Sequence, residues 1–142
     1  MIRGTTEQFK FQMPYEFGKL CWIEVTFWQP GHSGTEIAPL PFKKVYDKRD
    51  GSTRDDGFAP EGNELTSKTV IISLTDEETR RFTDKCKGYV QVMALCDKED
   101  IKFGSKPTTF IVYPAALEDT FDDIGQSAIL PKVQILDAGE LK

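Results

Sequence analysis

The chain has 142 residues, a formal charge of −5, 39% hydrophobic residues and 29% charged residues. This composition fits one globular domain, and no apolar run approaches the roughly 20 residues that a membrane-spanning helix needs. The acidic balance is opposite in sign to the usual electrostatic footprint of a nucleic-acid binder. We therefore expect no membrane insertion and no generic binding to DNA or RNA.

The first residues contain no apolar segment and no small-residue cleavage site, so we expect a protein made in a cytoplasm and not secreted by a signal peptide. Three cysteines without a C-x-x-C pair argue against a disulfide framework. Cys21 and Cys96 fall on the apolar side of predicted strands, where a thiol usually acts as a small core residue. The single histidine, His32, lies in a glycine-rich turn without a ligand-spaced partner, so we predict no metal and no other cofactor.

Alternating apolar and polar residues predict the strands of the first half of the chain. One strand runs through Phe9, Phe11 and Met13. The next, over residues 21–28, has an apolar face and a second face that carries Trp22, Glu24, Thr26 and Trp28. An edge strand is expected over residues 42–46, after two prolines. Residues 47–64 are almost wholly polar and predict a long exposed loop.

The second half begins with a predicted strand over residues 65–74, which leads into Thr75-Asp76-Glu77-Glu78. That tetrapeptide is a capping box, so a short helix is expected over residues 76–84 with Phe82 as its anchor in the core. A strong, central strand is predicted over residues 89–97 and another over 108–113. Residues 115–124 read as a linker or a short helix. The apolar run over 129–136 predicts an edge strand, paired either with its own sheet or with a neighbour's.

Six or seven short strands and one short helix near residues 76–84 favour a mainly β protein, an antiparallel β-sandwich. We divide the chain into a β-sandwich domain over residues 1–114, which carries the polar loop at 47–64, and a C-terminal linker with a docking strand over residues 115–142. Val133 and Ile135 of that strand are candidate binding residues, because an edge strand can pair with a partner's sheet.

The sequence offers no catalytic constellation, so we expect that the protein is not an enzyme. A Ser-His-acid triad would need His32, and the nucleophile-elbow motif G-x-S-x-G is absent from the sequence. The densest carboxylates are more typical of a solvated face than of a hydrolase site, although a small enzyme that uses them is a third hypothesis; they are Glu118, Asp119, Asp122 and Asp123.

Trp22 and Trp28 share a strand face with Glu24 and are the better candidates for binding. A wide, rigid ring beside polar groups suits stacking on a sugar or a hot spot in a protein interface. At about 3.3 Å per residue, the two indoles stand about 20 Å apart, so an extended partner would be required. The alternative is that the protein's own helix or its C-terminal segment covers this face.

Several segments occur in the same order as in small proteins from the structural-gene region of phages and prophages of Gram-positive bacteria. They are the opening residues 1–6 with the strand at 9–11, the junction at 74–79 with Phe82, the strand at 90–92, and a terminal strand before the acidic segment 118–124. The chain resembles these proteins, and it departs from them in the loop at 47–64 and in an apolar tail after residue 124.

The resemblance implies a non-enzymatic virion component, an accessory head or tail protein with an immunoglobulin-like or related β-sandwich fold. Its partners would be other virion proteins or copies of itself, and its location the virion, after synthesis in the bacterial cytoplasm. The alternative function is a carbohydrate-binding module that recognises a host-surface glycan through Trp22 or Trp28.

Overall fold

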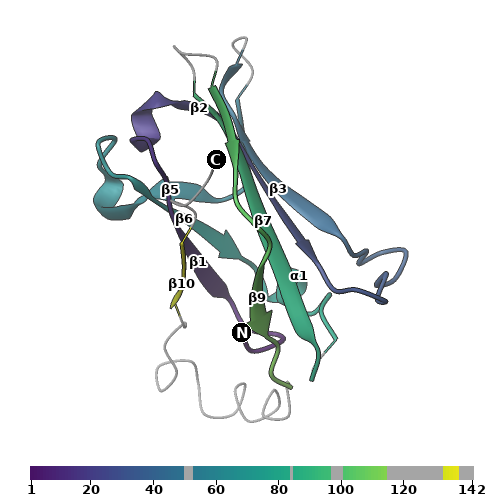
Figure 1. Ribbon diagram of the computed structural model, residues 1–142. Coiled ribbons are helices and arrows are strands. Elements are labelled where there is room, and N and C mark those ends of the chain that lie inside the picture. The colour runs from purple at the N-terminus through teal and green to yellow at the C-terminus, as the bar shows by residue number, and fades with distance from the viewer. Residues whose placement is uncertain (50–52, 84, 97–100, 115–132, 138–142) are drawn as a thin grey trace.

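The computed structural model describes residues 1–49, 53–83, 85–96, 101–114 and 133–137, the last of these by their backbone. Two β-sheets lie face to face and enclose the core between them (Figure 1). This arrangement confirms the expected mainly β fold and the antiparallel β-sandwich. Among the described residues, no helix has the length and apolar character needed to cross a bilayer.

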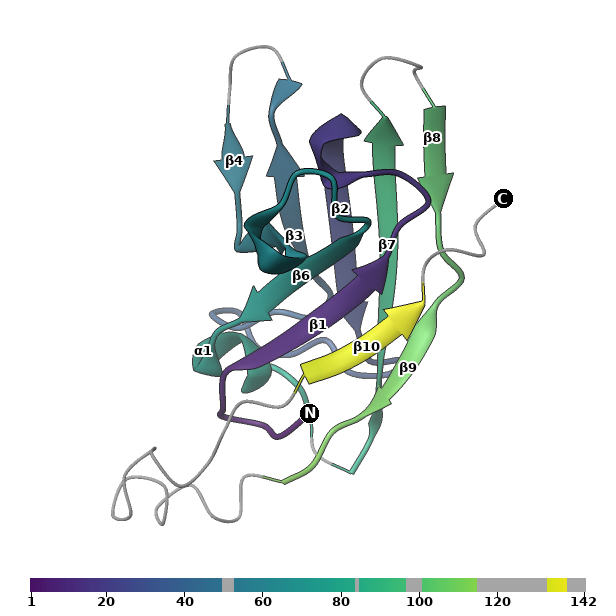
Figure 2. The same ribbon diagram turned by 90° about the vertical axis from the view of Figure 1, so that its left-hand side faces the viewer.

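The sheets have four and six strands. The first has the order β10–β1–β6–β5 (Figure 2), and its strands are β1 Glu7–Gln12, β5 Phe58–Pro60, β6 Thr69–Leu74 and β10 Val133–Asp137. The second has the order β4–β3–β2–β7–β8, with β9 also paired to β7; its strands are β2 Leu20–Trp28, β3 Phe42–Asp47, β4 Arg54–Asp55, β7 Lys87–Cys96, β8 Ile101–Gly104 and β9 Thr108–Ile111. These pairings are antiparallel except that of β1 with β10, which is parallel.

The core follows from the period-two pattern of the strands, because alternate side chains of β1 and β2 point into the sandwich and are buried. A cluster of aromatic rings fills its centre, with neighbouring ring centroids 5.1 to 6.5 Å apart; its members are Phe9, Phe27, Phe42, Phe82 and Phe110. A side chain at Gly88 would clash with the Phe110 ring, so β7 needs a glycine there. The cluster therefore joins both sheets through tightly fitted rings.

The predicted capping box at the start of α1, Asp76–Thr79, is confirmed. The Thr75 hydroxyl accepts a hydrogen bond from the backbone N–H of Glu78 at 3.2 Å, and the Glu78 carboxylate accepts one from the Thr75 N–H at 2.9 Å. The same carboxylate lies 2.7 Å from Nζ of Lys44, a buried residue of β3, and this ammonium also donates to the Ser73 carbonyl at 2.8 Å. Lys44 thus ties the six-stranded sheet to α1 through an ion pair and to the end of β6 through a hydrogen bond.

The prediction of one long exposed loop over residues 47–64 is wrong. This stretch contains β4, β5 and a 3-10 helix at Glu61–Asn63. Phe58 pairs with Ile72 and is buried, which anchors the stretch to β6. The strand over residues 42–46 was predicted to be an edge strand. This prediction is also wrong, because β4 pairs with the outer side of β3, Phe42–Asp47.

The predicted helix over residues 76–84 is only four residues long. The chain leaves the helix after Thr79, whose buried hydroxyl donates to the Thr5 carbonyl and accepts from the Gly4 N–H. Phe82 is nevertheless buried as predicted. Tertiary contacts override the helical tendency here, because Phe82 has to reach the core and the Thr83 N–H donates to the Gln29 side chain at 2.7 Å.

Two predicted strands need corrected bounds, and one strand was missed. The strand predicted over 65–74 begins at Thr69, and the one predicted over 108–113 ends at Ile111. The strand β8 was not predicted, because it directly follows a charged stretch that reads as a turn. The strong strand over 89–97 is confirmed as β7, with β2 on one side and β8 and β9 on the other.

The C-terminal apolar run forms β10 and pairs with β1 of its own chain (Figure 2). Of the two pairings considered for this run, the structure therefore shows the intramolecular one. The linker or short helix predicted over 115–124 lies outside the described residues, and so do Glu118, Asp119, Asp122 and Asp123.

Candidate functional site

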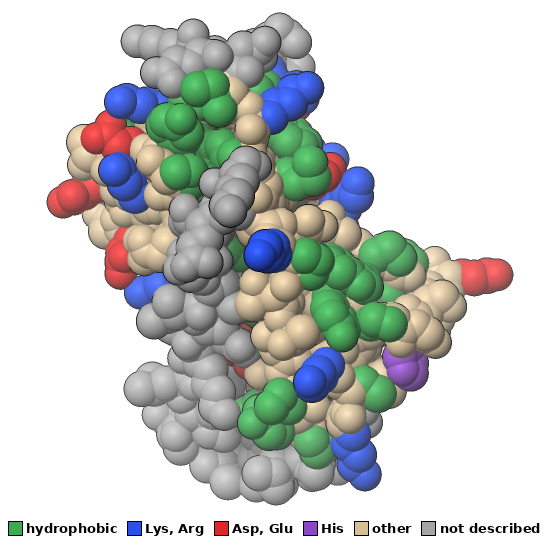
Figure 3. Space-filling model, in the orientation of Figure 1, with side chains coloured by type: hydrophobic (Ala, Val, Ile, Leu, Met, Phe, Trp, Pro, Cys, Tyr) green, Lys and Arg blue, Asp and Glu red, His purple; other side chains and the backbone are tan. Residues whose placement is uncertain are grey.

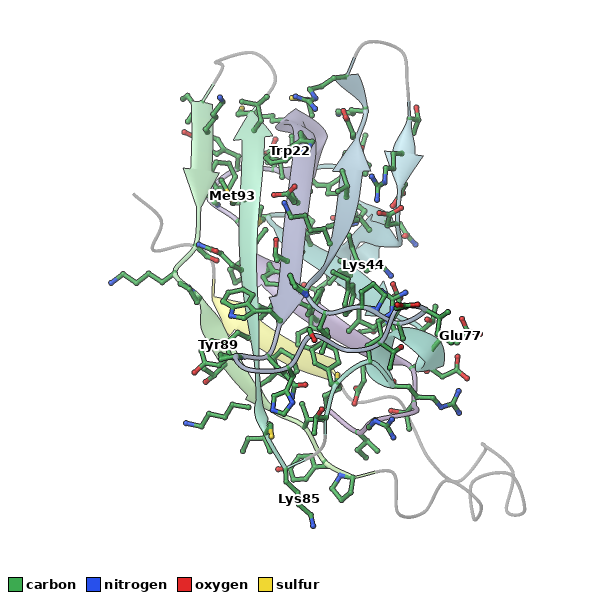
Figure 4. All side chains as sticks on the ribbon, turned by 90° about the vertical axis from the view of Figure 1, so that its right-hand side faces the viewer. Trp22, Lys44, Glu77, Lys85, Tyr89 and Met93 are labelled. Atoms are coloured by element: carbon green, nitrogen blue, oxygen red, sulfur yellow. The ribbon has the colours of Figure 1, made fainter. Side chains whose placement is uncertain are left out.

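The candidate site is the outer face of the six-stranded sheet, which we call the tryptophan face. It is formed by the outward side chains of three adjacent strands, and these are Trp22, Glu24, Thr26 and Trp28 on β2, Lys43 and Val45 on β3, and Tyr89, Gln91, Met93 and Leu95 on β7. Figure 4 shows this face with Trp22, Tyr89 and Met93 labelled on it. The structure thus brings three predicted residues, Trp22, Glu24 and Trp28, onto one surface.

Trp28 and Tyr89 face each other across the pairing of β2 with β7. Their rings are stacked, with centroids 5.6 Å apart and an interplanar angle of 22°. Both side chains are half-buried, so each ring still meets solvent. A stacked, partly exposed pair of this kind forms a rigid platform with little side-chain entropy to lose on binding.

Trp22 lies at the opposite end of β2, where Arg49 covers its ring with the guanidinium carbon 5.7 Å from the ring centroid. Arg49 is held in this position by Asp47, whose carboxylate lies 3.0 Å from Nε. The hydrogen bonds from Arg49 also lower the pKa of Asp47. One face of the Trp22 ring is therefore already occupied by a cation from the same chain.

Glu24 lies between the two tryptophans and forms an ion pair with Lys43 at 3.4 Å. Opposite Glu24 on β7 stands Met93, whose side chain is 46% exposed. A flexible thioether at the centre of a sheet face adapts to the shape of whatever packs on it. The centre of the tryptophan face therefore combines an apolar, adaptable contact with one ion pair.

Of the elements that were the alternative cover for this face, the described ones, α1 and β10, lie elsewhere, and residues 115–132 and 138–142 of the C-terminal segment lie outside the described residues. α1 follows β6 at the side of the sandwich, and β10 belongs to the four-stranded sheet. Figure 4 accordingly shows β2 and β7 with neither of these elements in front of them. Figure 3 shows that hydrophobic side chains also gather on the side of the molecule that the six-stranded sheet occupies.

The other two candidate residues, Val133 and Ile135, lie on β10, where their backbones pair with Gln8 and Lys10 of β1. They therefore belong to the edge of the other sheet. The structure does not bring them together with the tryptophans, so the candidate residues fall into two separate regions.

His32 lies next to a cysteine that is distant in the sequence. His32 Nε2 is 3.6 Å from Cys86 Sγ, and His32 Nδ1 is 3.4 Å from the Thr83 hydroxyl. Cys21 and Cys96 are buried, as expected of core thiols. Within the ranges that the structure describes, no group of three or more metal-ligating side chains comes together.

Sequence reasoning did not select Tyr89, Met93 and Leu95 as binding residues. A signal was nevertheless present, because the strand over residues 89–97 is apolar on both faces. A strand that is buried on one side only should alternate with polar residues. The outer side of this strand therefore carries more apolar residues than the alternation of a half-solvated strand predicts.

Models of known protein families do not match this sequence, and no curated protein matches it either.

Proposed function

We propose that the protein is a non-enzymatic structural or adaptor component of a phage particle. It packs against other virion proteins or copies of itself, and it resides in the virion after synthesis in the bacterial cytoplasm. The resemblance of its segments to phage structural-region proteins supports the phage setting. The packing role is supported by one observation, the partly exposed aromatic side chains of the tryptophan face.

The composition of the tryptophan face suits a protein interface. Trp, Tyr and Met are enriched in interfaces and Trp and Tyr in their hot spots, while a stable interface buries about 800 Å² on each partner. Met93 and the Trp28–Tyr89 pair supply the apolar centre, and the Glu24–Lys43 pair adds charges at its side. Burial of such a centre favours association through loss of apolar surface from water.

The test compares particle incorporation of the wild-type chain with that of Met93→Glu, which places a charge at the centre of the face. Gln12→Glu is the matched control, because Gln12 is exposed on the four-stranded sheet. Particles released after prophage induction are purified, and the chain is counted by mass spectrometry against the major capsid protein. We expect a fixed stoichiometry for wild type and control, and a loss of about tenfold or more for Met93→Glu, since a buried unpaired charge is costly.

Two results would contradict the proposal. If the wild-type chain is abundant in the cell but missing from the particles, the virion role is wrong. If Met93→Glu is incorporated as well as the wild-type chain, the role of the tryptophan face is wrong.

A carbohydrate-binding module for host-surface recognition is the second candidate, and the stacked Trp28–Tyr89 pair favours it. Thr26 and Gln91, which pair directly beside these rings, offer polar groups that could bind sugar hydroxyls. Binding of the chain to purified cell-wall polysaccharide is measured for the wild type and for Trp28→Ala. Loss of binding in Trp28→Ala, with a far-UV circular dichroism spectrum that still shows the wild-type fold, supports this function. Absence of binding by the wild type contradicts it.

A further inference from the structure

A hollow of about 580 Å³ lies at one end of the sandwich, where the loop after β2 meets the segment after α1. It concentrates positive charge in an acidic protein, because three of the five arginines of the chain line it. The lining residues that matter here are Arg3, Arg80, Arg81, His32, Ser33 and Thr35. Its lining contains no carboxylate among the described residues.

The walls of the hollow are held in place by hydrogen bonds. The buried Gln29 side chain donates to the Thr83 carbonyl at 2.9 Å and accepts from the Thr83 N–H at 2.7 Å, so the loop is fastened to the segment after α1. Within the loop, the Leu40 N–H donates to the Ser33 carbonyl at 3.0 Å. A side chain at Gly34, which has a φ of +69°, would clash with the Ala38 backbone. These contacts preorganise the loop after β2.

Two of the arginines are positioned by contacts that leave their charge uncompensated. Nε of Arg3 donates to the Phe82 carbonyl at 2.8 Å, which fixes the guanidinium without neutralising it. Arg81 lies over the Phe42 ring, 4.9 Å from the centroid. In the part of the chain that the structure describes, no carboxylate pairs with either of them. Arg80 differs, because it forms an ion pair with Asp76 at 3.5 Å.

From this geometry we infer that the hollow binds a phosphate-type oxyanion. A guanidinium presents a planar fork of donors that matches two oxygens of a phosphate, and Arg3 and Arg81 supply two such forks. The hydroxyls of Ser33 and Thr35 add donors from the loop side. A tetrahedral oxyanion has enough acceptor sites for all of these donors, whereas a single carboxylate has fewer. This site is separate from the tryptophan face and does not depend on the proposed function.

His32 provides a direct readout, because it lines the hollow and is the only histidine of the chain. Inorganic phosphate is titrated into the full-length protein at fixed pH and ionic strength, with chloride as the reference salt, and the ring signals of His32 are followed by NMR. The variants are Arg81→Gln and Arg3→Gln. Arg54→Gln is the control, because Arg54 lies on β4, is 60% exposed and pairs with Asp56.

We expect a saturable shift of the His32 signals with phosphate, and a weakening of about tenfold in each of the two hollow variants, as for the loss of a charge-assisted hydrogen bond. Arg54→Gln should bind phosphate like the wild type. Absence of a saturable shift, or equal binding by the wild type and both hollow variants, overturns the site. Succinate that binds as tightly as phosphate overturns the assignment to a tetrahedral oxyanion.

Discussion

The two sheets of the sandwich have similar inner faces but contrasting outer faces. Outside the four-stranded sheet, the paired side chains of β1 and β6 are mainly polar, and they include Gln8, Lys10, Gln12, Ile71 and Ser73. Outside the six-stranded sheet, the corresponding positions carry two tryptophans, a tyrosine and an exposed methionine. The first face is what a half-solvated antiparallel sheet needs. The second carries more apolar and aromatic side chains than a half-solvated sheet requires, and this excess supports the proposal that it packs against a partner.

The contrast between inside and outside can be tested at two neighbouring positions of β2. Phe27 is fully buried and contacts four other rings, so Phe27→Ala should lower the free energy of unfolding by about 3–5 kcal/mol. Trp28→Ala, on the outer face, should cost about 1 kcal/mol through loss of the Tyr89 stack. Urea denaturation measures both. Equal losses would mean that the tryptophan face is a second core.

Two consecutive lysines of β3 provide the next comparison. Lys44→Ala removes the buried partner of Glu78 and should destabilise the fold by about 2–3 kcal/mol. Lys43→Ala removes only the exposed partner of Glu24 and should change stability by less than about 0.5 kcal/mol. Thermal unfolding of both variants is the measurement. A similar melting temperature for the two variants would show that the contacts of Lys44 with α1 and β6 do not stabilise the sandwich.

The four-stranded sheet can be opened at its edge by deleting residues 127–142, which removes β10. The deletion exposes the edge of β1 to water, and we expect a loss of about 1–2 kcal/mol because a few backbone hydrogen bonds are replaced by bonds to solvent. Amide hydrogen exchange should accelerate in β1 and stay slow in β7, which is interior to the other sheet. Unchanged exchange in β1 would contradict the parallel pairing of β1 with β10.

The smallest expected effect concerns pH and the contact of β3 with Asp56, the residue that follows β4. Burial alone would raise the pKa of Asp56, but hydrogen bonds from Arg54 and from the Val45 N–H outweigh it and lower the pKa. A lowered pKa stabilises the fold above the unfolded pKa, and this contribution disappears as the pH falls through the folded value.

Asp56→Asn should therefore be less stable than wild type at neutral pH, by less than about 1 kcal/mol, and the difference should begin to shrink near pH 4 and disappear once the pH is below the lowered pKa of Asp56. Urea denaturation at a series of pH values measures the difference. If the difference in stability persists undiminished at acid pH, the effect of the substitution does not come from the charge of Asp56.

The sequence was sufficient for those elements whose local pattern agrees with the tertiary structure. The alternation in β1, β2 and β7 and the capping box at Thr75 predicted these elements correctly, because a period-two pattern and a cap are local signals. The loop prediction failed over residues 53–64, because a single long-range contact decides the structure there. One buried ring, Phe58, anchors a stretch that is otherwise polar. Such an anchor has no periodicity to detect.

The candidate sites show the same division. Trp22 and Trp28 could be selected from one strand, because they share a face at even spacing. The partners Tyr89 and Arg49 could not, since strand register and a turn decide their contacts. The hollow was also inaccessible to sequence reasoning. It joins Arg3, His32 and Arg81, which are far apart in the sequence and come together only through the Gln29–Thr83 bridge and the contacts of Arg3.

The lengths of the strands have a further consequence. The described edges are short, with two residues in β4, three in β5 and five in β10, while β7 has ten. Along β7, the edge is divided into β8 and β9 by a buried serine, Ser105, whose hydroxyl accepts from the Val92 N–H. Short and interrupted edges give an incoming strand little to pair with, which protects a protein against fibrillar aggregation. At high local concentration, pairing of edge strands between copies of this chain is therefore disfavoured.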